Sequence, residues 1–260
     1  MGVKENCKLI KKEELVSGIY KYSVEAPEIA KSAKPGQFLE IKVTKEGVEP
    51  FLRRPISIFN LDGNIVEFIF QVKGRGTELL AKREVGEEIN IMGPLGYGTF
   101  KIGEYKNVAI IGGGIGIYPL YELAKELQGK AKNINVYLGF RNRSLVTCEK
   151  DFEKVSNKLV IATDDGSYKE RGFAINYLKE DAKTEKLDMI FACGPLPMLK
   201  SVREYAIEEN IPCQISLEER MGCGIGACLG CAVKIISGKE DRFGHVCKEG
   251  PVFNATDVEI

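Results

Sequence analysis

Residues 108–119 read Val108-Ala-Ile-Ile-Gly112-Gly-Gly114-Ile-Gly116-Ile-Tyr-Pro119. An apolar run that passes through a glycine-rich turn into an amphipathic stretch predicts a strand, a turn and a helix whose N-terminus faces a pyrophosphate. Pro119 replaces the third glycine of the dinucleotide fingerprint, and proline is tolerated in the first turn of a helix. Such a loop alone could be a plain turn. Its place after the first strand of an alternating half favours dinucleotide binding.

Strand and helix patterns alternate from about residue 105 onward. This alternation is typical of a parallel α/β sheet, and we predict a nucleotide domain over residues 103–212. Strands are expected over 107–111, 134–140, 158–163 and 187–192, and helical stretches over 118–127, 152–155 with its flanks, 173–178 and 197–208.

The first hundred residues have a different rhythm, with short β-rich runs at 37–43, 54–59 and 65–72 separated by glycine-containing turns. Such a pattern predicts a small antiparallel β-barrel, here over residues 1–102, with one inserted helix at 77–82.

One end of this predicted barrel carries groups suited to a phosphate. Arg54 can pair with a phosphate through two nitrogens, and the turn at Gly76–Thr77 offers N–H groups at a helix start. The motif Arg54-Pro-Ile-Ser57 is only weakly specific, because an exposed strand end with a proline would look the same.

Four of the eight cysteines crowd into the last forty residues or so, and the predicted C-terminal segment is 213–260. They read Cys223-Gly-Ile-Gly-Ala-Cys228-Leu-Gly-Cys231, with Cys247 further on. This C-x4-C-x2-C…C spacing is that of plant-type [2Fe–2S] ferredoxins, and crowded cysteines in a chain without an export signal favour metal ligation over disulfides. Zinc is the first alternative, although zinc ribbons usually show two C-x2-C pairs. Free thiols are the second.

Cys193 follows the strand expected over 187–192. Ligands of open α/β sheets gather at the carboxyl ends of strands, so Cys193 is a candidate to lie near a nicotinamide. It could equally be a buried cysteine that packs as a small hydrophobe. His245, the single histidine, could donate a hydrogen bond near the cluster or be a solvated loop residue. No triad or metal site built on several histidines is possible.

The charge balance limits the classes of partner. Lys and Arg number 37, as do Asp and Glu, which argues against nucleic-acid binding but not against a dinucleotide held by backbone N–H groups. No apolar stretch approaches the roughly 20 residues needed to span a bilayer, and the charged start has no apolar signal region. We therefore expect a cytoplasmic protein.

The order of these motifs resembles the ferredoxin–NADP reductase superfamily. Within it, two C-terminal segments resemble the electron-transfer subunits of dihydroorotate dehydrogenase B. They are Glu218-Glu-Arg-Met-Gly-Cys-Gly-Ile-Gly-Ala-Cys-Leu-Gly-Cys231 and His245-Val-Cys-Lys-Glu-Gly-Pro-Val-Phe-Asn254. The resemblance covers the whole chain and all four clustered cysteines.

The resemblance implies FAD on the barrel, NAD on the α/β domain with Cys193 as the catalytic candidate, and a [2Fe–2S] cluster. It implies a catalytic partner subunit that binds FMN and oxidises dihydroorotate for pyrimidine biosynthesis, in a 2+2 heterotetramer. The surface around residues 223–231 would then be partly buried on association. The cofactor contacts that it implies are Arg54, Pro55, Ile56, Ser57, Phe70, Gln71, Val72, Gly76 and Thr77 for FAD, Gly113, Gly114, Gly116 and Gly194 for NAD, and Cys223, Cys228, Cys231 and Cys247 for the cluster.

Two alternatives stay open. The chain could be a reductase component with the same cofactors that serves another redox partner, or, more distantly, a zinc-stapled nucleotide-binding protein. Arg141 and Arg143 could suit the 2′-phosphate of NADP, whereas the family resemblance favours NAD.

Overall fold

The computed structural model describes residues 2–44, 49–238 and 241–260. Contacts between these residues divide the chain into two compact units. The barrel unit comprises Met1–Thr99, Glu218–Ala232 and His245–Pro251. The α/β unit comprises Phe100–Leu217, Val233–Gly244 and Val252–Ile260. Each unit therefore contains residues from the C-terminal region.

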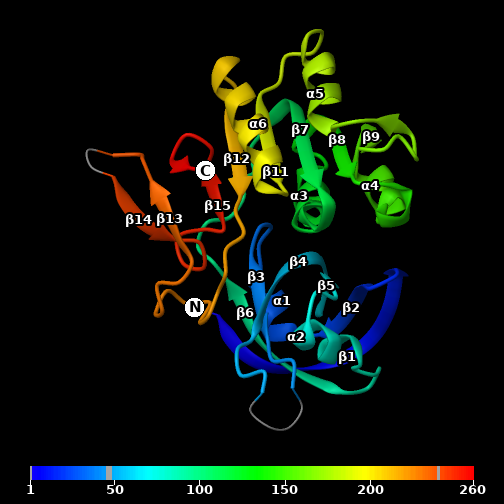
Figure 1. Ribbon diagram of the computed structural model, residues 1–260, viewed down its shortest axis with the longest axis vertical. Helices are drawn as coiled ribbons and strands as arrows, with labels where there is room; N and C mark the ends of the chain where they lie inside the picture. The colour runs from blue at the N-terminus through cyan, green and yellow to red at the C-terminus, as the bar shows by residue number, and fades with distance from the viewer. Residues whose placement is uncertain (1, 45–48, 239–240) are drawn as a thin grey trace. The chain divides into compact units, whose positions relative to one another are not determined.

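The barrel unit is built on six antiparallel strands that close in the order β1-β2-β5-β4-β3-β6 (Figure 1). This confirms the predicted barrel. The strands are β1 (Val3–Val16), β2 (Ile19–Glu25), β3 (Phe38–Ile41), β4 (Arg54–Asp62), β5 (Ile65–Gln71) and β6 (Glu88–Leu95), and the helices are α1 (Pro27–Ala30) and α2 (Arg75–Ala81).

The inside of the barrel is filled by apolar side chains that alternate with outward polar ones, as a closed sheet requires. Tyr22 is fully buried, and its hydroxyl donates a 2.6 Å hydrogen bond to the carbonyl oxygen of Leu80. This bond fixes α2 to the barrel and so positions the turn at its N-terminus.

The α/β unit has a seven-stranded sheet in the order β10-β9-β8-β7-β11-β12-β15, parallel except for β15. This confirms the predicted α/β architecture. Its strands are β7 (Tyr105–Gly113), β8 (Ala131–Phe140), β9 (Lys158–Thr163), β10 (Glu170–Arg171), β11 (Met189–Cys193), β12 (Cys213–Ser216) and β15 (Val252–Asn254).

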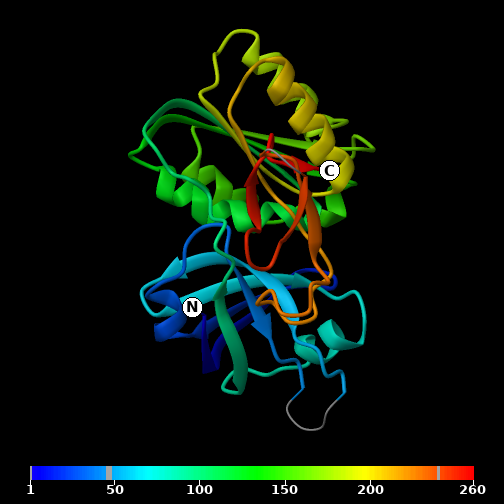
Figure 2. The same cartoon turned by 90° about the vertical axis from the view of Figure 1, so that its left-hand side faces the viewer.

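Helices cover both faces of this sheet (Figure 2). One pair, α3 and α4, packs on one face, and the other pair, α5 and α6, packs on the opposite face. The α-helices are α3 (Pro119–Leu127), α4 (Glu149–Val155), α5 (Ala174–Ala182) and α6 (Leu196–Glu208), and the short 3-10 helices are η1 (Gly114–Ile117) and η2 (Arg143–Leu145).

The C-terminal region does not form one continuous segment in the structure. Strands β12 and β15 extend the α/β sheet, and β13 (Ala232–Ile235), β14 (Arg242–His245) and β16 (Val258–Glu259) form a separate three-stranded sheet. The predicted range 213–260 follows the positions of the cysteines, because these short strands carry no local pairing signal. The three predicted domain ranges stay a prediction. No helix among the described residues is long and apolar enough to cross a membrane.

Candidate functional site

Residues 222–231, which we call the cysteine loop, belong to the barrel unit. Backbone N–H groups converge on the sulfur of Cys223, with the nitrogens of Ala227, Cys228 and Ile225 at 3.2, 3.4 and 3.5 Å. Such donors stabilise a thiolate, or a sulfur bound to iron, and tune its electronic properties. The loop is therefore built to hold negative charge on sulfur.

The fourth cysteine is brought to the loop by the segment 245–251. The nitrogen of Gly226 lies 3.1 Å from the sulfur of Cys247, and the nitrogen of Cys247 lies 3.4 Å from the sulfur of Cys231. Cys231 and Cys247 are buried, Cys223 is half-buried and Cys228 is exposed. All four cysteines named from the sequence thus come together in one part of the barrel unit.

The acidity of two of these thiols differs strongly. Burial acts to raise the pKa of Cys223, but the N–H groups of the loop and the side chain of Cys228 outweigh it and lower the pKa to about 6. Burial raises the pKa of Cys247 to about 12, and the neighbouring thiol of Cys231 adds to the rise. One edge of the site thus favours a thiolate before any metal binds.

The thiols interact most directly as two pairs, and Cys223 also acts electrostatically on Cys247. The side chains of Cys223 and Cys228 interact, and so do those of Cys231 and Cys247. Among the described residues, no group of three or more His, Cys, Asp or Glu side chains is placed to hold a metal ion. A structural zinc site needs four ligands on one ion, whereas a [2Fe–2S] cluster distributes four thiolates over two irons. The paired arrangement fits the two-iron cluster better.

Glycines let the cysteine loop approach the barrel closely. Gly224 has φ +71°, and a Cβ there would lie 2.5 Å from Cγ of Glu40. Gly226 has φ +81°, and a Cβ there would lie 2.8 Å from Cδ of Lys248. Both positions combine a left-handed backbone with close contacts, so only glycine fits without strain.

Glu40 is a site residue that the sequence did not reveal. It is 1 % exposed, and neither carboxylate oxygen has a hydrogen-bond partner among the described residues. Burial raises its pKa to about 7, Arg53 and Arg54 oppose the rise, and Cys223 adds to it. In the sequence it is one polar residue in an alternating strand, and nothing local signals that the cysteine loop covers it.

The predicted FAD contacts lie on β4, on β5 and at the start of α2. Arg54 crosses the N-terminal turn of α2, since a Cβ at Gly76 would lie 2.5 Å from its Nε. The hydroxyl of Thr77 accepts from the nitrogens of Lys73 and Gly74 at 2.9 and 3.3 Å. One nitrogen of the Arg54 guanidinium donates to the carbonyl of Leu52 at 2.6 Å. Together, the guanidinium and this ordered turn form a site suited to a pyrophosphate.

The remaining barrel candidates differ in what their side chains do. Pro55, Ile56 and Ser57 continue β4 and are half-buried, as are Gln71 at the end of β5 and Val72 directly after it. The ring of Phe70 is 2 % exposed and packs edge-on against Tyr22, with centroids 5.1 Å apart. The side chain of Phe70 therefore supports the strand from inside the barrel, which leaves its backbone for a ligand.

In the α/β unit, residues 112–116, which we call the glycine turn, join β7 to η1 and α3. A Cβ at Gly116 would lie 2.5 Å from Cα of Gly194, and one at Gly113 would lie 2.8 Å from the sulfur of Met198. Gly114 has φ +55° and open space around it. The turn therefore has a bare backbone surface next to the end of β11.

Cys193 lies beside this turn, in register with Gly112 in the parallel pairing of β11 and β7. It is 1 % exposed. Its place at the carboxyl end of β11 agrees with a nicotinamide-binding role, and its burial agrees with a packing role, so both interpretations survive. Gly194 follows it at the same edge, with φ +159°.

The two arginines considered for NADP follow β8. The guanidinium of Arg143 lies 5.5 Å from the centroid of the Tyr168 ring, and its backbone nitrogen donates to the hydroxyl of Ser167 at 2.8 Å. Arg141 is exposed. His245 donates its backbone N–H to a carboxylate oxygen of Glu249 at 3.3 Å, which orders the turn before Cys247.

Family models match two parts of the chain. Residues 218–259 match the iron-sulfur cluster binding domain of dihydroorotate dehydrogenase B, and residues 110–204 match the oxidoreductase NAD-binding domain. The first match contains the cysteine loop and Cys247, and the second contains the glycine turn and Cys193.

Curated relatives match along almost the whole chain. A dihydroorotate dehydrogenase B (NAD(+)) electron transfer subunit of Desulforamulus reducens is 39% identical over 241 residues, which cover 92% of each chain. The subunit of the same name from Bacillus mycoides is 38% identical over 269 residues, with full coverage of both.

Solved structures share the fold. The structure of an NADH-dependent reduced ferredoxin-NADP oxidoreductase is 28% identical, with a TM-score of 0.87, and covers 100% of this chain and 91% of that one. The ferredoxin reductase of carbazole 1,9a-dioxygenase is 20% identical with a TM-score of 0.67, over 81% of this chain and 67% of that one. The second similarity shows the fold alone.

Proposed function

The chain belongs to the family of electron transfer subunits of dihydroorotate dehydrogenase B (NAD⁺), and from that premise we propose how its residues perform this activity. It is an oxidoreductase subunit of pyrimidine biosynthesis, with an iron–sulfur cluster, FAD and NAD as cofactors. The name of these relatives implies a catalytic partner subunit. We propose that electrons pass from FMN of that partner through a [2Fe–2S] cluster and FAD to NAD⁺, in a 2+2 heterotetramer. The cytoplasmic location stays a prediction.

The observation that carries this proposal is the set of backbone N–H groups around the sulfurs of Cys223 and Cys247. Cys223, Cys228, Cys231 and Cys247 hold the cluster, and the loop N–H groups stabilise charge on its sulfurs. A bound flavin exchanges two electrons with a nicotinamide and single electrons with an iron–sulfur cluster, so it joins the two kinds of carrier.

The other residues bind and orient. Arg54 and the N-terminal turn of α2 hold the pyrophosphate of FAD, and the half-buried β4 residues that follow Arg54 lie along the flavin. The glycine turn holds the pyrophosphate of NAD at the N-terminus of a helix. Cys193 and Gly194 line the nicotinamide site, with Cys193 acting as a positioning residue or as packing beneath the ring.

Dihydroorotate-dependent NAD⁺ reduction tests this proposal. We expect activity when the chain is assembled with an FMN-binding partner and none when the chain is alone, because we place the dihydroorotate reaction in the partner subunit. Absorbance bands of both flavin and a [2Fe–2S] cluster should accompany the activity. A preparation that lacks both sets of bands would contradict the assignment of both FAD and the cluster to this chain.

A second candidate is a reductase component that serves another redox partner. It is favoured by the 28% identical structure, which carries similar units in an NADH-dependent reduced ferredoxin-NADP oxidoreductase. If NADH reduces the bound flavin but no FMN-binding partner supports dihydroorotate turnover, this candidate replaces the first. Reduced ferredoxin is then the electron donor to assay.

A further inference from the structure

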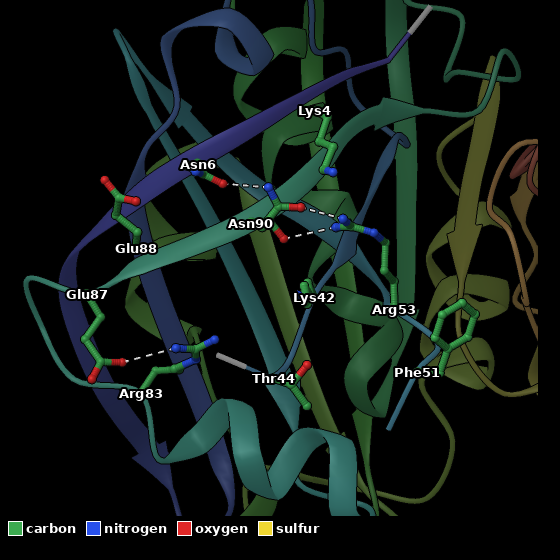
Figure 3. Close-up of a pocket in the computed structure, with 10 residues that line it drawn as sticks. All are labelled: Lys4, Asn6, Lys42, Thr44, Phe51, Arg53, Arg83, Glu87, Glu88 and Asn90. Carbon is green, nitrogen blue, oxygen red and sulfur yellow. Dashed lines mark hydrogen bonds and ion pairs between the residues drawn. The ribbon is translucent and has the colours of Figure 1, made fainter. Parts of the chain in front are cut away.

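A pocket of about 760 Å³ lies on the outer face of the barrel unit, outside the proposed cofactor contacts (Figure 3). Its floor comes from β1, β6 and the residues that follow β3. Asn90 lines it between Ile89 and Ile91, which are both fully buried and point into the barrel. The alternation of a β-strand therefore directs the pocket residues away from the core.

The pocket is more cationic than anionic. Among the described residues that line it, Lys4, Lys42, Arg53 and Arg83 oppose Glu87 and Glu88, a net charge of +2. Figure 3 shows both carboxylates at the opposite end from Lys4 and Arg53, and Glu87 faces Arg83 with 3.5 Å between their nearest charged atoms. The cationic end is left without a nearby carboxylate side chain among the pocket residues.

Two of these cations are available to a partner. Lys4 and Lys42 are exposed, and neither ammonium group forms an ion pair with another described residue. Exposed lysines are common on protein surfaces, so these two indicate a binding site only together with the rigid cation between them. This cation is Arg53.

Arg53 is fixed by a hydrogen-bond network, and Figure 3 draws the part of it that joins Arg53, Asn90 and Asn6. One guanidinium nitrogen donates to the carbonyl oxygens of Glu40 and Asn90 at 3.0 and 3.1 Å, and the other donates to the amide oxygen of Asn90. The amide nitrogen of Asn90 donates in turn to the amide oxygen of Asn6 at 2.6 Å. The network holds the positive charge in place, so little side-chain entropy is lost when an anionic group binds.

The same network connects the pocket to the cysteine loop. Arg53 bonds to the carbonyl of Glu40, and the side chain of Glu40 lies against Gly224. The segments that carry these residues also hold large exposed apolar groups: Phe51, two residues before Arg53, is 82% exposed, and Ile225 and Leu229 of the cysteine loop are 55% and 59% exposed. A protein that delivers electrons to the cysteine loop must approach this part of the barrel unit.

We propose that this pocket is a docking surface for an acidic segment of the FMN-binding catalytic subunit. The inference rests on the proposed function. Apolar groups beside the cysteine loop form the centre of the interface, and Lys4, Lys42 and Arg53 receive carboxylates at its rim. Charges at a rim steer association and select the orientation of docking more than they add affinity.

The test uses the holo chain, loaded with FAD and cluster, and the purified FMN subunit. The variant K4E/K42E reverses both exposed charges and leaves the Arg53 network in place. We expect association to slow by about tenfold to a hundredfold at low ionic strength, and to approach the wild-type rate near 1 M salt, where charges are screened. The control K130E/K132E reverses two exposed lysines of the α/β unit and should associate like the wild type.

A second measurement locates the contact. Lysine acetylation followed by mass spectrometry should show Lys4 and Lys42 protected in the complex and Lys130 and Lys132 unprotected. NADH-dependent dye reduction by the variant should match the wild type, which shows that the cofactor sites are intact.

The outcomes separate the two proposals. If the wild-type chain binds the FMN subunit and supports dihydroorotate turnover, but K4E/K42E associates at the wild-type rate and both lysines stay reactive, the docking surface is overturned and the function stands. If no FMN subunit binds the wild-type holo chain, the proposed function and the docking surface fail together.

Discussion

The glycine turn and the cysteine loop are both short and glycine-rich, yet they are held in different ways. In the glycine turn, a Cβ at Gly116 would meet the backbone of Gly194 at 2.5 Å, so the turn is shaped by its neighbours in the protein. The cysteine loop is largely exposed between Ile225 and Gly230, and many of its N–H groups point at sulfur. One turn is formed by packing. The other is shaped around the cysteine sulfurs.

Removal of a cluster ligand should have the largest effect on activity in the complex. It should not change NAD binding at the glycine turn. We expect Cys228→Ser to lose bound iron and to bring dihydroorotate-dependent NAD⁺ reduction in the complex down to background. NADH-dependent dye reduction should continue, because it needs only FAD and NAD. Iron analysis and the two assays test this difference. Retention of full dihydroorotate activity by the iron-free variant would refute the assignment of these ligands.

Alkylation of the cluster-free chain should distinguish the acidic thiol of Cys223 from the thiol of Cys247, which packs against the cysteine loop. The pKa of Cys223 is lowered to about 6, so its thiolate is present above pH 6 and lost as the pH falls below it. The pKa of Cys247 is raised to about 12, so it stays a thiol at neutral pH. Iodoacetamide at pH 7.5 should modify Cys223 more than a hundredfold faster than Cys247, since only the thiolate reacts. Equal rates by mass spectrometry would argue against a loop that is preformed.

A methyl group in the glycine turn should disturb packing and NAD binding together. Gly116→Ala places a Cβ against the backbone of Gly194, and overpacking of this kind costs about 1–3 kcal/mol. We expect a lower Tm and a KM for NADH raised by about tenfold. Gly139→Ala is the matched control, because its backbone is not left-handed and the atom nearest to its Cβ would be Cβ of Ala174 at 3.5 Å, an ordinary van der Waals contact. The idea is wrong if the two variants lose the same stability and affinity.

The smallest effect is expected where the cysteine loop touches the barrel. Gly224→Ala combines a φ of +71° with a Cβ 2.5 Å from Cγ of Glu40, whose side chain is buried. A left-handed alanine costs about 1–2 kcal/mol, and we expect iron occupancy to fall by a few fold. The double variant G224A/E40A removes the contact but not the backbone strain, so it should recover part of the occupancy. No recovery would show that the contact with Glu40 has no influence on the loop.

Local signals in the sequence predicted much of this architecture. Strand β9 was expected over 158–163 and spans Lys158–Thr163, because an apolar β-branched run between turns is a strong signal. The cysteine loop followed from ligand spacing. The sites of Glu40 and Arg53 could not be found in this way, since their roles arise from contacts with Gly224 and Asn90, far along the chain. Strands β12 and β15 were missed for the same reason, as each completes a sheet through distant partners.

The chain enters the barrel unit three times, because Glu218–Ala232 and His245–Pro251 join Met1–Thr99. Residues 218–259 match one family model, yet they contribute to both units. The iron–sulfur region is therefore not a cassette that could be cut out, grafted onto another reductase or expressed by itself. The backbone nitrogens of Tyr97 and Gly98 in the barrel bond to the carbonyls of Lys248 and Gly250. An exchange of this region between relatives must therefore include that part of the barrel surface.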